Sequence, residues 1–411
     1  MSSNDFFSKA VTTAPGKANS IIPNEQTGKL VQLKDGSVRK AESNVVKAQF
    51  RNLILVPPSS TVSSGLFSAG LIEFRLSKQT VVDTLTSVVI KVTLNNATGG
   101  AVVLAPVYSW IDRWELYGAS GNKLLSQTYG NTEMFHNLMF IPRTEFECNA
   151  ASLAMTTAYG TSGVTLANGA TASYYIPLYN FFAATKLHLA AIPGDLVIRI
   201  RFNPTTLSLI SGSAPTITDI NLQLRGLMEP DAYRKERVAD YMRYKHDLPF
   251  LSNQRQSQTL TLAPSTTYNI ILSGFRGICS CLAFVVQVSP ITSANQYTYS
   301  QMQDYDIQDQ SGISLRGSYR TTFVDTQLDY ARRFPNLFLN NINTHVINFS
   351  DNPVSDYHEG TNNGFIAFNS FEKLSITTPS TLAGGAFQIT IFGWMHESLF
   401  IQNGQVTVSQ A

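Results

Sequence analysis

Two groups of acidic residues offer the clearest candidates for site chemistry in this chain. Asp304, Asp306 and Asp309 lie close together, and Asp351 and Asp356 lie in a segment rich in Gly, Asn and Pro. Carboxylate oxygens are ligands that Ca²⁺ prefers, so both groups are candidate calcium sites. The first group lacks the Asp-x-Asp-x-Asp-Gly…Glu pattern of a calcium loop, and solvated turn carboxylates are the simpler interpretation. We therefore predict no metal site and keep these five residues as alternatives.

Catalytic motifs are absent from the sequence. There is no Gly-x-Ser-x-Gly elbow, no phosphate-binding loop and no His-Glu-x-x-His pair. The six histidines are scattered without the spacing that metal ligands need. A carboxylate pair could serve a glycosidase, but nothing in the sequence selects one pair. We predict that the protein is not an enzyme and uses no cofactor.

Cationic residues gather near the N-terminus. Residues 1–51 hold eight Lys and Arg against four Asp and Glu, a net charge of +4 in a chain whose net charge is +2. Because residues 1–48 show no sustained periodicity, we predict an extended arm there. This arm is either solvated or docks on an anionic surface such as lipid headgroups or nucleic acid, although its charge is sparse for tight nucleic-acid binding. The arm residues predicted to face a membrane or a neighbouring subunit are Lys9, Lys17, Lys29, Lys34, Arg39 and Lys40.

Cysteine use and hydropathy indicate where the protein is made. Cys148, Cys279 and Cys281 are too few and too unevenly spaced for a disulfide framework, and we expect buried free thiols. Free thiols fit a reducing compartment. The first residues lack the apolar core of a signal peptide, and no run of about 18 apolar residues could span a membrane as a helix. We expect synthesis without export.

The elements that would position any site are short β-strands. Charged residues make up only 14% of the chain, whereas Phe and Tyr number 24 and 17. Short apolar runs alternate with stretches rich in Thr, Ser, Asn and Gly, which is typical of all-β proteins. The low charge also suggests that neighbouring subunits cover much of the surface.

A weak internal repeat indicates that one β-rich unit occurs twice. Residues 114–121 (WELYGASG) match residues 305–312 (YDIQDQSG) at an offset of 191 residues. At the same offset, residues 86–94 fall on residues 277–285. Duplication explains both matches, and chance similarity is the alternative because the match is short.

A polar segment separates two sets of seven or eight strand-like runs. Ten of the residues 231–247 are acidic, basic or His, and Pro230 followed by Asp231 is a helix-start signal. We predict a linker helix that is either solvated or used by a partner. The strand count fits an all-β fold of two tandem eight-stranded jelly rolls with short helices and an extended N-terminal arm. The predicted units are the arm (1–48), the first jelly roll (49–228), the linker helix (229–248), the second jelly roll (249–398) and a C-terminal tail or hairpin (399–411).

Four other segments give local expectations. Residues 148–171 are rich in Ala, Thr, Gly and Ser and are expected to form an exposed loop. Residues 180–191 are compatible with a helix. The Asn403-Gly404 pair between two apolar runs predicts a hairpin. Without secretion, the glycosylation sequons at Asn96 and Asn348 are expected to be coincidental.

Three groups of segments are similar to one known family in their order and spacing. They are residues 89–94 (VIKVTL) with 111–117, residues 175–178 (YIPL) with 181–193 and 196–203 (LVIRIRFN), and residues 330–335 (YARRFP) with 364–368 and 388–398. Over residues 50–398 the chain resembles the double jelly-roll major capsid proteins of the tectivirus–adenovirus lineage.

The resemblance implies a homotrimer whose six jelly rolls form a pseudo-hexagonal capsomer. Such capsomers would tile the icosahedral shell of a double-stranded DNA virus, over an internal lipid membrane. The implied partners are other copies of the chain, neighbouring capsomers, the membrane and minor capsid or penton proteins, with no specific nucleic acid. The protein would reside in the virion after assembly in the host cytoplasm or nucleus. Two other classes stay open: a carbohydrate-binding or glycoside-cleaving β-sandwich protein, and a viral receptor-binding or vertex protein.

Overall fold

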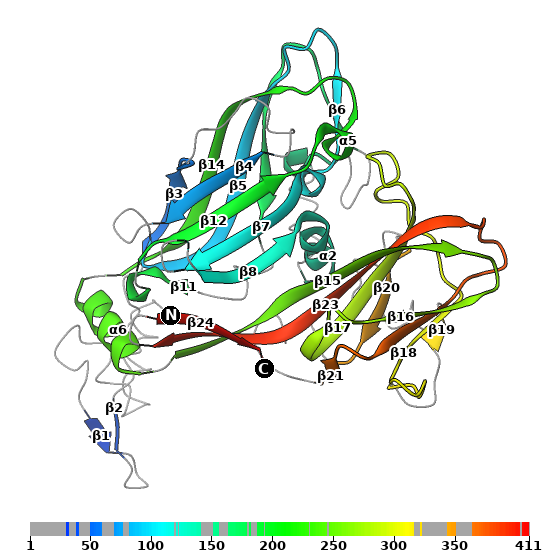
Figure 1. The fold of residues 1–411 in the computed structure, drawn as a ribbon. Helices are drawn as coiled ribbons and strands as arrows, with labels where there is room; N and C mark the ends of the chain where they lie inside the picture. The colour runs from blue at the N-terminus through cyan, green and yellow to red at the C-terminus, as the bar shows by residue number, and fades with distance from the viewer. Residues whose placement is uncertain are drawn as a thin grey trace, which may run out of the picture.

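Alternating apolar and polar residues build both halves of the chain into antiparallel β-structure. Because successive strand residues point to opposite faces, each alternating run buries one face and leaves the other accessible. Figure 1 shows the result in the computed structural model: two β-structures joined side by side. The structure describes the chain from Leu30 to Gln410 except for residues 33–37, 41–49, 60–69, 77–81, 119–120, 122, 141–150, 156–162, 179–180, 182–186, 193, 230, 245, 316–320, 323–342, 351–363 and 403–404.

The first half of the chain, from β3 to β14, forms a two-sheet sandwich that we call the first roll. One sheet has the order β10-β5-β14-β3, with β11 also paired to β5, and the other has the order β4-β12-β7-β8. Strands far apart in sequence are neighbours in both sheets, as in a jelly roll. The strand bounds are Phe50–Val56 (β3), Leu71–Leu76 (β4), Thr84–Asn95 (β5), Ile111–Gly118 (β7), Lys123–Tyr129 (β8), Thr171–Pro177 (β10), Leu187–His188 (β11), Leu196–Phe202 (β12) and Thr216–Met228 (β14).

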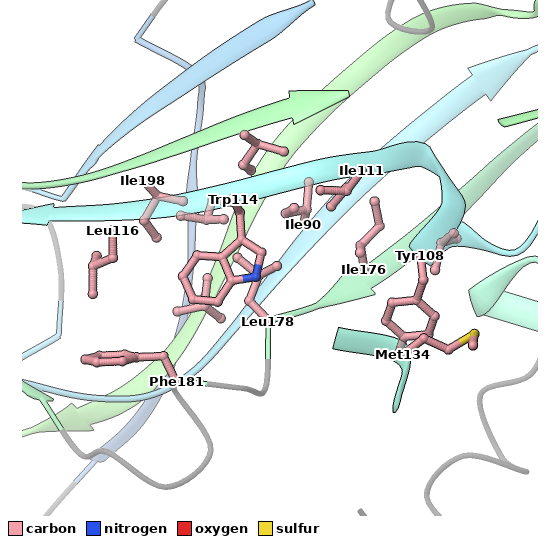
Figure 2. Packing of buried hydrophobic residues seen from close by; sticks show 14 of the residues in the cluster. Ile90, Tyr108, Ile111, Trp114, Leu116, Met134, Ile176, Leu178, Phe181 and Ile198 are labelled. Atoms are coloured by element: carbon pink, nitrogen blue, oxygen red, sulfur yellow. The ribbon is translucent and has the colours of Figure 1, made fainter. Parts of the chain in front are cut away.

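The inner faces of these two sheets meet in an apolar core. Ile90 on β5 and Trp114 on β7 are both fully buried, and Figure 2 shows Trp114 among Ile90, Leu178 and Ile198. Burying one aliphatic side chain of this size stabilises the fold by about 1.5–3 kcal/mol. The indole of Trp114 is also satisfied, because its Nε1 donates a hydrogen bond to Glu133 Oε2 at 3.1 Å.

The second half, from β15 to β24, repeats this architecture and is called the second roll. One sheet has the order β15-β23-β17-β20, with β21 also paired to β17 and β24 to β23, and the other has the order β16-β22-β18-β19. A separate apolar cluster fills the space between these sheets. The strand bounds are His246–Leu262 (β15), Thr267–Ile271 (β16), Arg276–Val288 (β17), Asp304–Gln308 (β18), Thr321–Thr322 (β19), His345–Asn348 (β20), Ile366–Asn369 (β21), Lys373–Thr377 (β22), Gly385–Gln402 (β23) and Gln405–Gln410 (β24).

The two rolls are equivalent strand by strand, and the sequence repeat marks one equivalent pair. Strands β7 and β18 hold the same place in their four-stranded sheets, β4-β12-β7-β8 and β16-β22-β18-β19. Trp114 on β7 lies opposite Ile200, and Tyr305 on β18 lies opposite Ile376. The matched residues therefore occupy the same position in each sheet, as duplication predicts.

The register of the repeat differs between strands. After β7 and β18, Gly121 and Gly312 both have positive φ, 97° and 86°, so the matched glycines share a backbone conformation. On β5 and β17, however, the offset of 191 aligns Ile90, which faces the core of its own roll, with Cys281, which faces the first roll. Leu282, one residue later, faces the second core. A shift of one residue exchanges the two faces of a strand, so the repeat identifies these strands without their register.

Segments between the strands of the first roll add a small sheet and two short helices. Figure 1 shows the sheet, with the order β13-β6-β9, at the top of the molecule. The bounds of these elements are Val102–Leu104 (β6), Gly130–Phe140 (α2), Val164–Leu166 (β9), Thr205–Ser208 (α5) and Leu209–Ser211 (β13).

Two local predictions need correction here. Residues 148–171 were expected to be exposed, but Leu153 and Met155 are each only 3% exposed because they pack into the apolar core between the small residues around them. In residues 180–191, the described part contains β11 and a 3₁₀ turn at Leu189–Ala191, so these residues do not form one continuous helix. The Asn96 sequon is buried, and its side-chain nitrogen donates to the carbonyl oxygens of Gly100 and Leu166, both at 2.8 Å.

Helix α6 (Asp231–Arg243) connects the rolls, and the strands beside it extend beyond the predicted limits. Strand β15 begins at His246, and β23 continues to Gln402 across the boundary predicted at residue 398. The extension follows from apolar alternation, because Leu399 and Ile401 are both fully buried. Strand β24 pairs back onto β23, with Ile401 opposite Val406, so a C-terminal hairpin closes on the chain's own second roll.

Candidate functional site

The main candidate for a functional surface is the junction where the second roll packs on the first. Helix α2 of the first roll lies against β23 of the second. Trp394 Nε1 donates a hydrogen bond to His136 Nδ1 at 3.1 Å, and both side chains are fully buried. Beside them, the rings of Phe135 and Phe392 lie 5.0 Å apart between centroids. The hydrogen-bonded indole and the tilted ring contact hold the two rolls in one orientation.

Further contacts extend the junction to both sides. Phe181 of the first roll packs edge-on against Phe250 of the second, with ring centroids 4.9 Å apart. Ser109 and Tyr297 share a hydrogen bond between their hydroxyl groups, and burial raises the pKa of the Tyr297 phenol, so it stays protonated. At the edge, the Arg255 guanidinium carbon lies 4.4 Å from the ring centroid of Tyr129, a cation–π contact.

The junction exists because β17 and β23 are apolar on both faces. On β17, Leu282, Phe284 and Val286 face the second core, whereas Cys281, Ala283 and Val285 belong to the cluster shared with the first roll. The side chains of Cys279 and Cys281 are buried free thiols, and burial raises the pKa of Cys279. A strand covered on both sides reads as a continuous apolar run, and residues 281–286 (CLAFVV) are such a run. This run is the sequence signal from which the junction could have been predicted.

The equivalent sheet of the first roll keeps its outer face open. Strand β14 holds the place of β23, and the outward residues Asn221, Gln223 and Arg225 are half-buried or exposed. On the neighbouring strand β3, Leu55 lies opposite Gln223 and is 52% exposed. We call this outer face of the β10-β5-β14-β3 sheet the first-roll wall. Within the described ranges of the single chain, one of two equivalent walls is thus covered by the other roll, and the first-roll wall is not.

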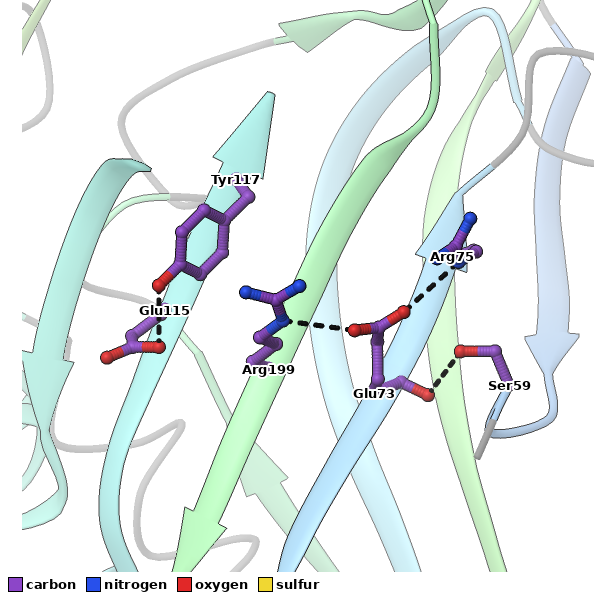
Figure 3. A network of polar contacts seen from close by, with 6 residues as sticks. All are labelled: Ser59, Glu73, Arg75, Glu115, Tyr117 and Arg199. Carbon is purple, nitrogen blue, oxygen red and sulfur yellow. Dashed lines mark hydrogen bonds and ion pairs between the residues drawn. The ribbon is translucent and has the colours of Figure 1, made fainter. Parts of the chain in front are cut away.

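A network of charged side chains covers the outer face of the other first-roll sheet. Figure 3 shows Glu73 between two arginines: its carboxylate lies 3.0 Å from Arg199 Nε and 3.1 Å from Arg75 Nε. Burial raises the pKa of Glu73, but the hydrogen bonds and charges of both arginines outweigh burial and hold its pKa below the ordinary value. The Arg199 guanidinium carbon also lies 4.5 Å from the ring centroid of Tyr117, whose hydroxyl donates to Glu115 Oε2 at 3.0 Å.

A buried polar cluster attaches α6 to the first roll. Arg234 Nε lies 2.6 Å from Asp83 Oδ1, and the backbone nitrogen of Glu229 donates to Asp83 Oδ2 at 2.7 Å. His188 Nδ1 lies 3.0 Å from Thr84 Oγ1 within the same cluster. Burial, assisted by nearby Arg237, lowers the pKa of His188 to about 4, so this imidazole is neutral at pH 7. The helix is therefore docked on the roll rather than only solvated.

The described acidic candidates, Asp304, Asp306 and Asp309, do not come together as a set. Asp306 is 3% exposed and accepts a hydrogen bond from Ser314 Oγ at 2.9 Å. Asp309 organises the following turn, accepting from Ser311 Oγ at 2.7 Å and from the Ile313 backbone nitrogen at 2.9 Å. Asp304 lies two residues before Asp306 on β18. Within the described ranges, no three His, Cys, Asp or Glu side chains gather as a group that could hold a metal ion.

Several other predicted site residues lie where the structure says little. Asp351 and Asp356 lie outside the described residues, as do Lys9, Lys17, Lys29 and Lys34 of the arm. Arg39 and Lys40 belong to β2 (Val38–Lys40), which pairs with β1 (Leu30–Gln32). Among the residues that the structure describes, none of the helices combines the length and apolar composition that crossing a membrane requires.

Comparison with known proteins adds structural likeness without sequence likeness. No family model matches the chain, and no curated protein matches it. The PBCV-1 VP54 structure fitted into the virophage Sputnik matches with a TM-score of 0.64 at 16% identity, covering 89% of this chain and 97% of that chain. The Faustovirus major capsid protein matches with a TM-score of 0.61 at 10% identity, covering 98% and 99%. The mavirus major capsid protein matches with a TM-score of 0.50 at 11% identity, covering 87% and 90%.

These observations define the class of the protein as a double jelly roll. More particularly, the chain has the fold of viral major capsid proteins, as the resemblance in its sequence predicts. The likeness extends over nearly the whole of the Faustovirus chain, so both rolls and their junction take part in it.

Proposed function

We propose that this protein is the major capsid protein of an icosahedral double-stranded DNA virus, a structural component of the virion without enzymatic activity. The observation that carries the proposal is the pair of equivalent jelly rolls, matched along 98% of the chain by the Faustovirus major capsid protein. The proposal agrees with a sequence that is poor in charge, rich in aromatic residues and without catalytic motifs.

The capsomer is a homotrimer in this proposal, and the junction supports it. The contact between the rolls is heterologous, because two different surfaces meet: the outer face of the β15-β23-β17-β20 sheet of the second roll and the α2 side of the first roll. Heterologous contacts generate closed rings when the rotation between units closes. Repeating the junction places the second roll of another subunit against the first-roll wall. Three chains then contribute six rolls with a pseudo-hexagonal outline.

The α6 end of the molecule faces the inside of the shell in this proposal. Figure 1 shows α6, the β23–β24 hairpin and the β1–β2 pair at this end. The cationic arm therefore starts where an internal membrane with anionic headgroups would lie. Neighbouring capsomers and minor capsid or penton proteins are the other proposed partners, with assembly in the host cytoplasm or nucleus.

The test is the mass of the purified protein in solution, measured by light scattering after gel filtration. We expect three times the chain mass of 45.2 kDa. Leu55→Asp places a charge on the first-roll wall and should weaken the trimer about tenfold or more, because a buried unpaired charge is costly. Leu71→Asp is the matched control, since Leu71 is 55% exposed on a different sheet while Leu55 is 52% exposed. The control should remain a trimer.

Three outcomes would count against the proposal. A wild-type protein that stays monomeric at high concentration and varied salt would contradict the proposed trimeric capsomer. Micromolar binding on a glycan array by a monomer would favour a carbohydrate-binding β-sandwich protein. A low copy number in purified particles would favour a receptor-binding or vertex protein, because a major shell protein must be the most abundant one.

A further inference from the structure

The outer face of the β4-β12-β7-β8 sheet carries more arginine than it can pair. On its outward positions, Arg75, Arg113, Arg199 and Arg201 face two glutamates, Glu73 and Glu115, which leaves a net charge of +2 on the face. We call this surface the arginine face. Glu73 forms ion pairs with Arg75 and Arg199, as Figure 3 shows, and Glu115 forms an ion pair with Arg113 at 2.9 Å.

Arg201 is the cation that remains. It is exposed, and the described part of the chain supplies it with no ion pair or hydrogen-bond partner. Its cross-strand neighbours are Leu71 on β4 and Arg113 on β7. Two like charges directly opposite each other on one sheet face are destabilising. A single chain gains nothing from this pair, so an anionic group from outside the chain is the natural complement.

The outer face of the equivalent sheet in the second roll has the opposite charge. Its described outward positions on β16, β22 and β18 carry two acids, Asp304 and Asp306, and one cation, Lys373, for a formal net charge of −1. Asp306 is only 3% exposed, so Asp304 is the acid that a docking partner can reach. Lys373 Nζ donates a hydrogen bond to the carbonyl oxygen of Gln310 at 2.7 Å. Asp304 lies opposite Thr322 and Thr377 and has no cationic partner among the described residues. We call this surface the aspartate face.

The contact between rolls that would build the trimer reaches the arginine face at its β8 edge, where Arg255 of the second roll lies over Tyr129. The junction uses the outer face of the β15-β23-β17-β20 sheet and the α2 side of the first roll, and its repetition would use the first-roll wall. Away from this edge, the arginine face and the aspartate face are available for contacts between capsomers. Two arginine faces in contact would repel each other, whereas an arginine face and an aspartate face attract.

We propose that the arginine face of one capsomer docks on the aspartate face of a neighbouring capsomer, so that the partner is a second copy of this chain. The inference rests on the proposed capsid function. It names the two surfaces through which capsomers would meet in the shell and states that they pair by opposite charge. Complementary charge would set the register of the contact and make shell assembly depend on ionic strength, since surface charges are screened over about 10 Å at 0.1 M salt.

The test uses purified full-length trimers assembling in solution, followed by light scattering and electron microscopy. Arg201→Glu and Asp304→Lys, each made alone, should lower the assembled fraction roughly tenfold or more at low salt, because like charges then meet. The double variant should recover assembly, because the charges are exchanged rather than removed. Arg243→Glu, which makes the same charge change at an exposed residue of α6, is the control and should assemble as the wild type does.

The readouts separate the inference from the proposed function. Arg201→Glu replaces a like-charge pair by an opposite-charge pair with Arg113, so the variant trimer should melt no lower than the wild type. If Arg201→Glu breaks the trimer instead, the arginine face lies inside the capsomer and the inference is wrong. If it assembles normally, or the double variant fails to recover, the pairing is also wrong while the capsid function stands. A wild-type protein that forms no trimer overturns the proposed function itself.

Discussion

At the scale of single residues, the second core contains a histidine that must stay neutral. His345 is fully buried, its ring lies 4.7 Å from that of Phe284, and its Nε2 accepts a hydrogen bond from the Met302 backbone nitrogen at 3.2 Å. Burial lowers the pKa of His345 to about 4, from 6.5 in the unfolded chain. A lowered folded-state pKa means that the unfolded state binds the proton more readily below pH 6.5.

His345 should therefore make stability depend on pH between about 6.5 and 4. Its contribution is fully present above pH 6.5 and is lost as the pH falls, by about 2 kcal/mol at pH 5. His345→Gln keeps an acceptor but cannot be protonated in this range. We expect urea unfolding at pH 7 and pH 5 to show a smaller loss of unfolding free energy on acidification for the variant than for the wild type. Equal losses in both proteins would mean that another group controls the acid transition.

Residue types and spacing in the sequence predict candidate polar residues better than they predict the surfaces at which the two rolls meet. The acids at 304, 306 and 309 can be named as candidates from their spacing alone. The hydrogen bonds that Asp306 accepts from Ser314 and Asp309 accepts from Ser311 depend on the turn after β18, which spacing does not show. The junction residues Trp394 and His136 lie 258 residues apart in sequence. Nothing local in either segment indicates the partner, so such pairs are decided by the packing of the two rolls.

At the scale of elements, α2 needs a glycine at its first position. A Cβ built on Gly130 would lie 2.2 Å from the Ile111 carbonyl oxygen and 2.3 Å from that of Tyr108. These are backbone atoms, so the helix would have to move away from the strand and turn on which it rests. Because α2 also carries Phe135 and His136 into the junction, such a movement would disturb both rolls.

Gly130→Ala should accordingly lower the unfolding free energy by about 1–3 kcal/mol or more, the usual cost of overpacking. Gly385→Ala is the matched control, because a Cβ there meets nothing within 4 Å. Thermal unfolding of both variants and the wild type, followed by circular dichroism, gives the comparison. A Gly130→Ala protein that melts with the Gly385→Ala control would show that α2 can shift without cost.

The order of the elements was more predictable than their faces. Alternation identified most strands, and Pro230 with Asp231 marked the start of α6. Register was not predictable on β17, because a strand that is apolar on both sides gives no signal about which side faces which core. Strands β15 and β23 cross the limits of 249 and 398 that we predict for the second roll, because both strands keep their alternation where they continue towards α6 and β24.

At the scale of the whole molecule, the chain is asymmetric although its two rolls are equivalent. Among the residues that the structure describes, one wall is covered by the junction and the other is open, and one outer sheet face is basic while its counterpart is acidic. A duplicated unit with identical surfaces would have no means of distinguishing its two copies. These differences lie on the outer faces, where subunits and capsomers would meet.

The arm belongs to this outer, assembly-related part of the molecule. In the described part of the chain, its strands β1 and β2 pair only with each other, and neither joins a sheet of the rolls. Deleting residues 2–45 should therefore leave a trimer whose melting temperature is within a few degrees of the wild type. The deletion removes most of the cationic residues of the arm, each of which contributes about 1 kcal/mol of attraction near an anionic membrane surface.

Flotation with vesicles containing anionic lipid measures this attraction. We expect the intact trimer to bind at low salt and to be released at high salt, and the truncated trimer to bind far less. A full-length variant with Lys9, Lys17, Lys29 and Lys34 changed to Gln controls for the loss of chain length and should behave like the deletion. If the truncated trimer instead melts far below the wild type, the arm supports the rolls, and the boundary that we predict at residue 48 is wrong. If both variants bind vesicles as the wild type does, the arm contacts neighbouring capsomers, and defective shell assembly by the truncated trimer would then be its consequence.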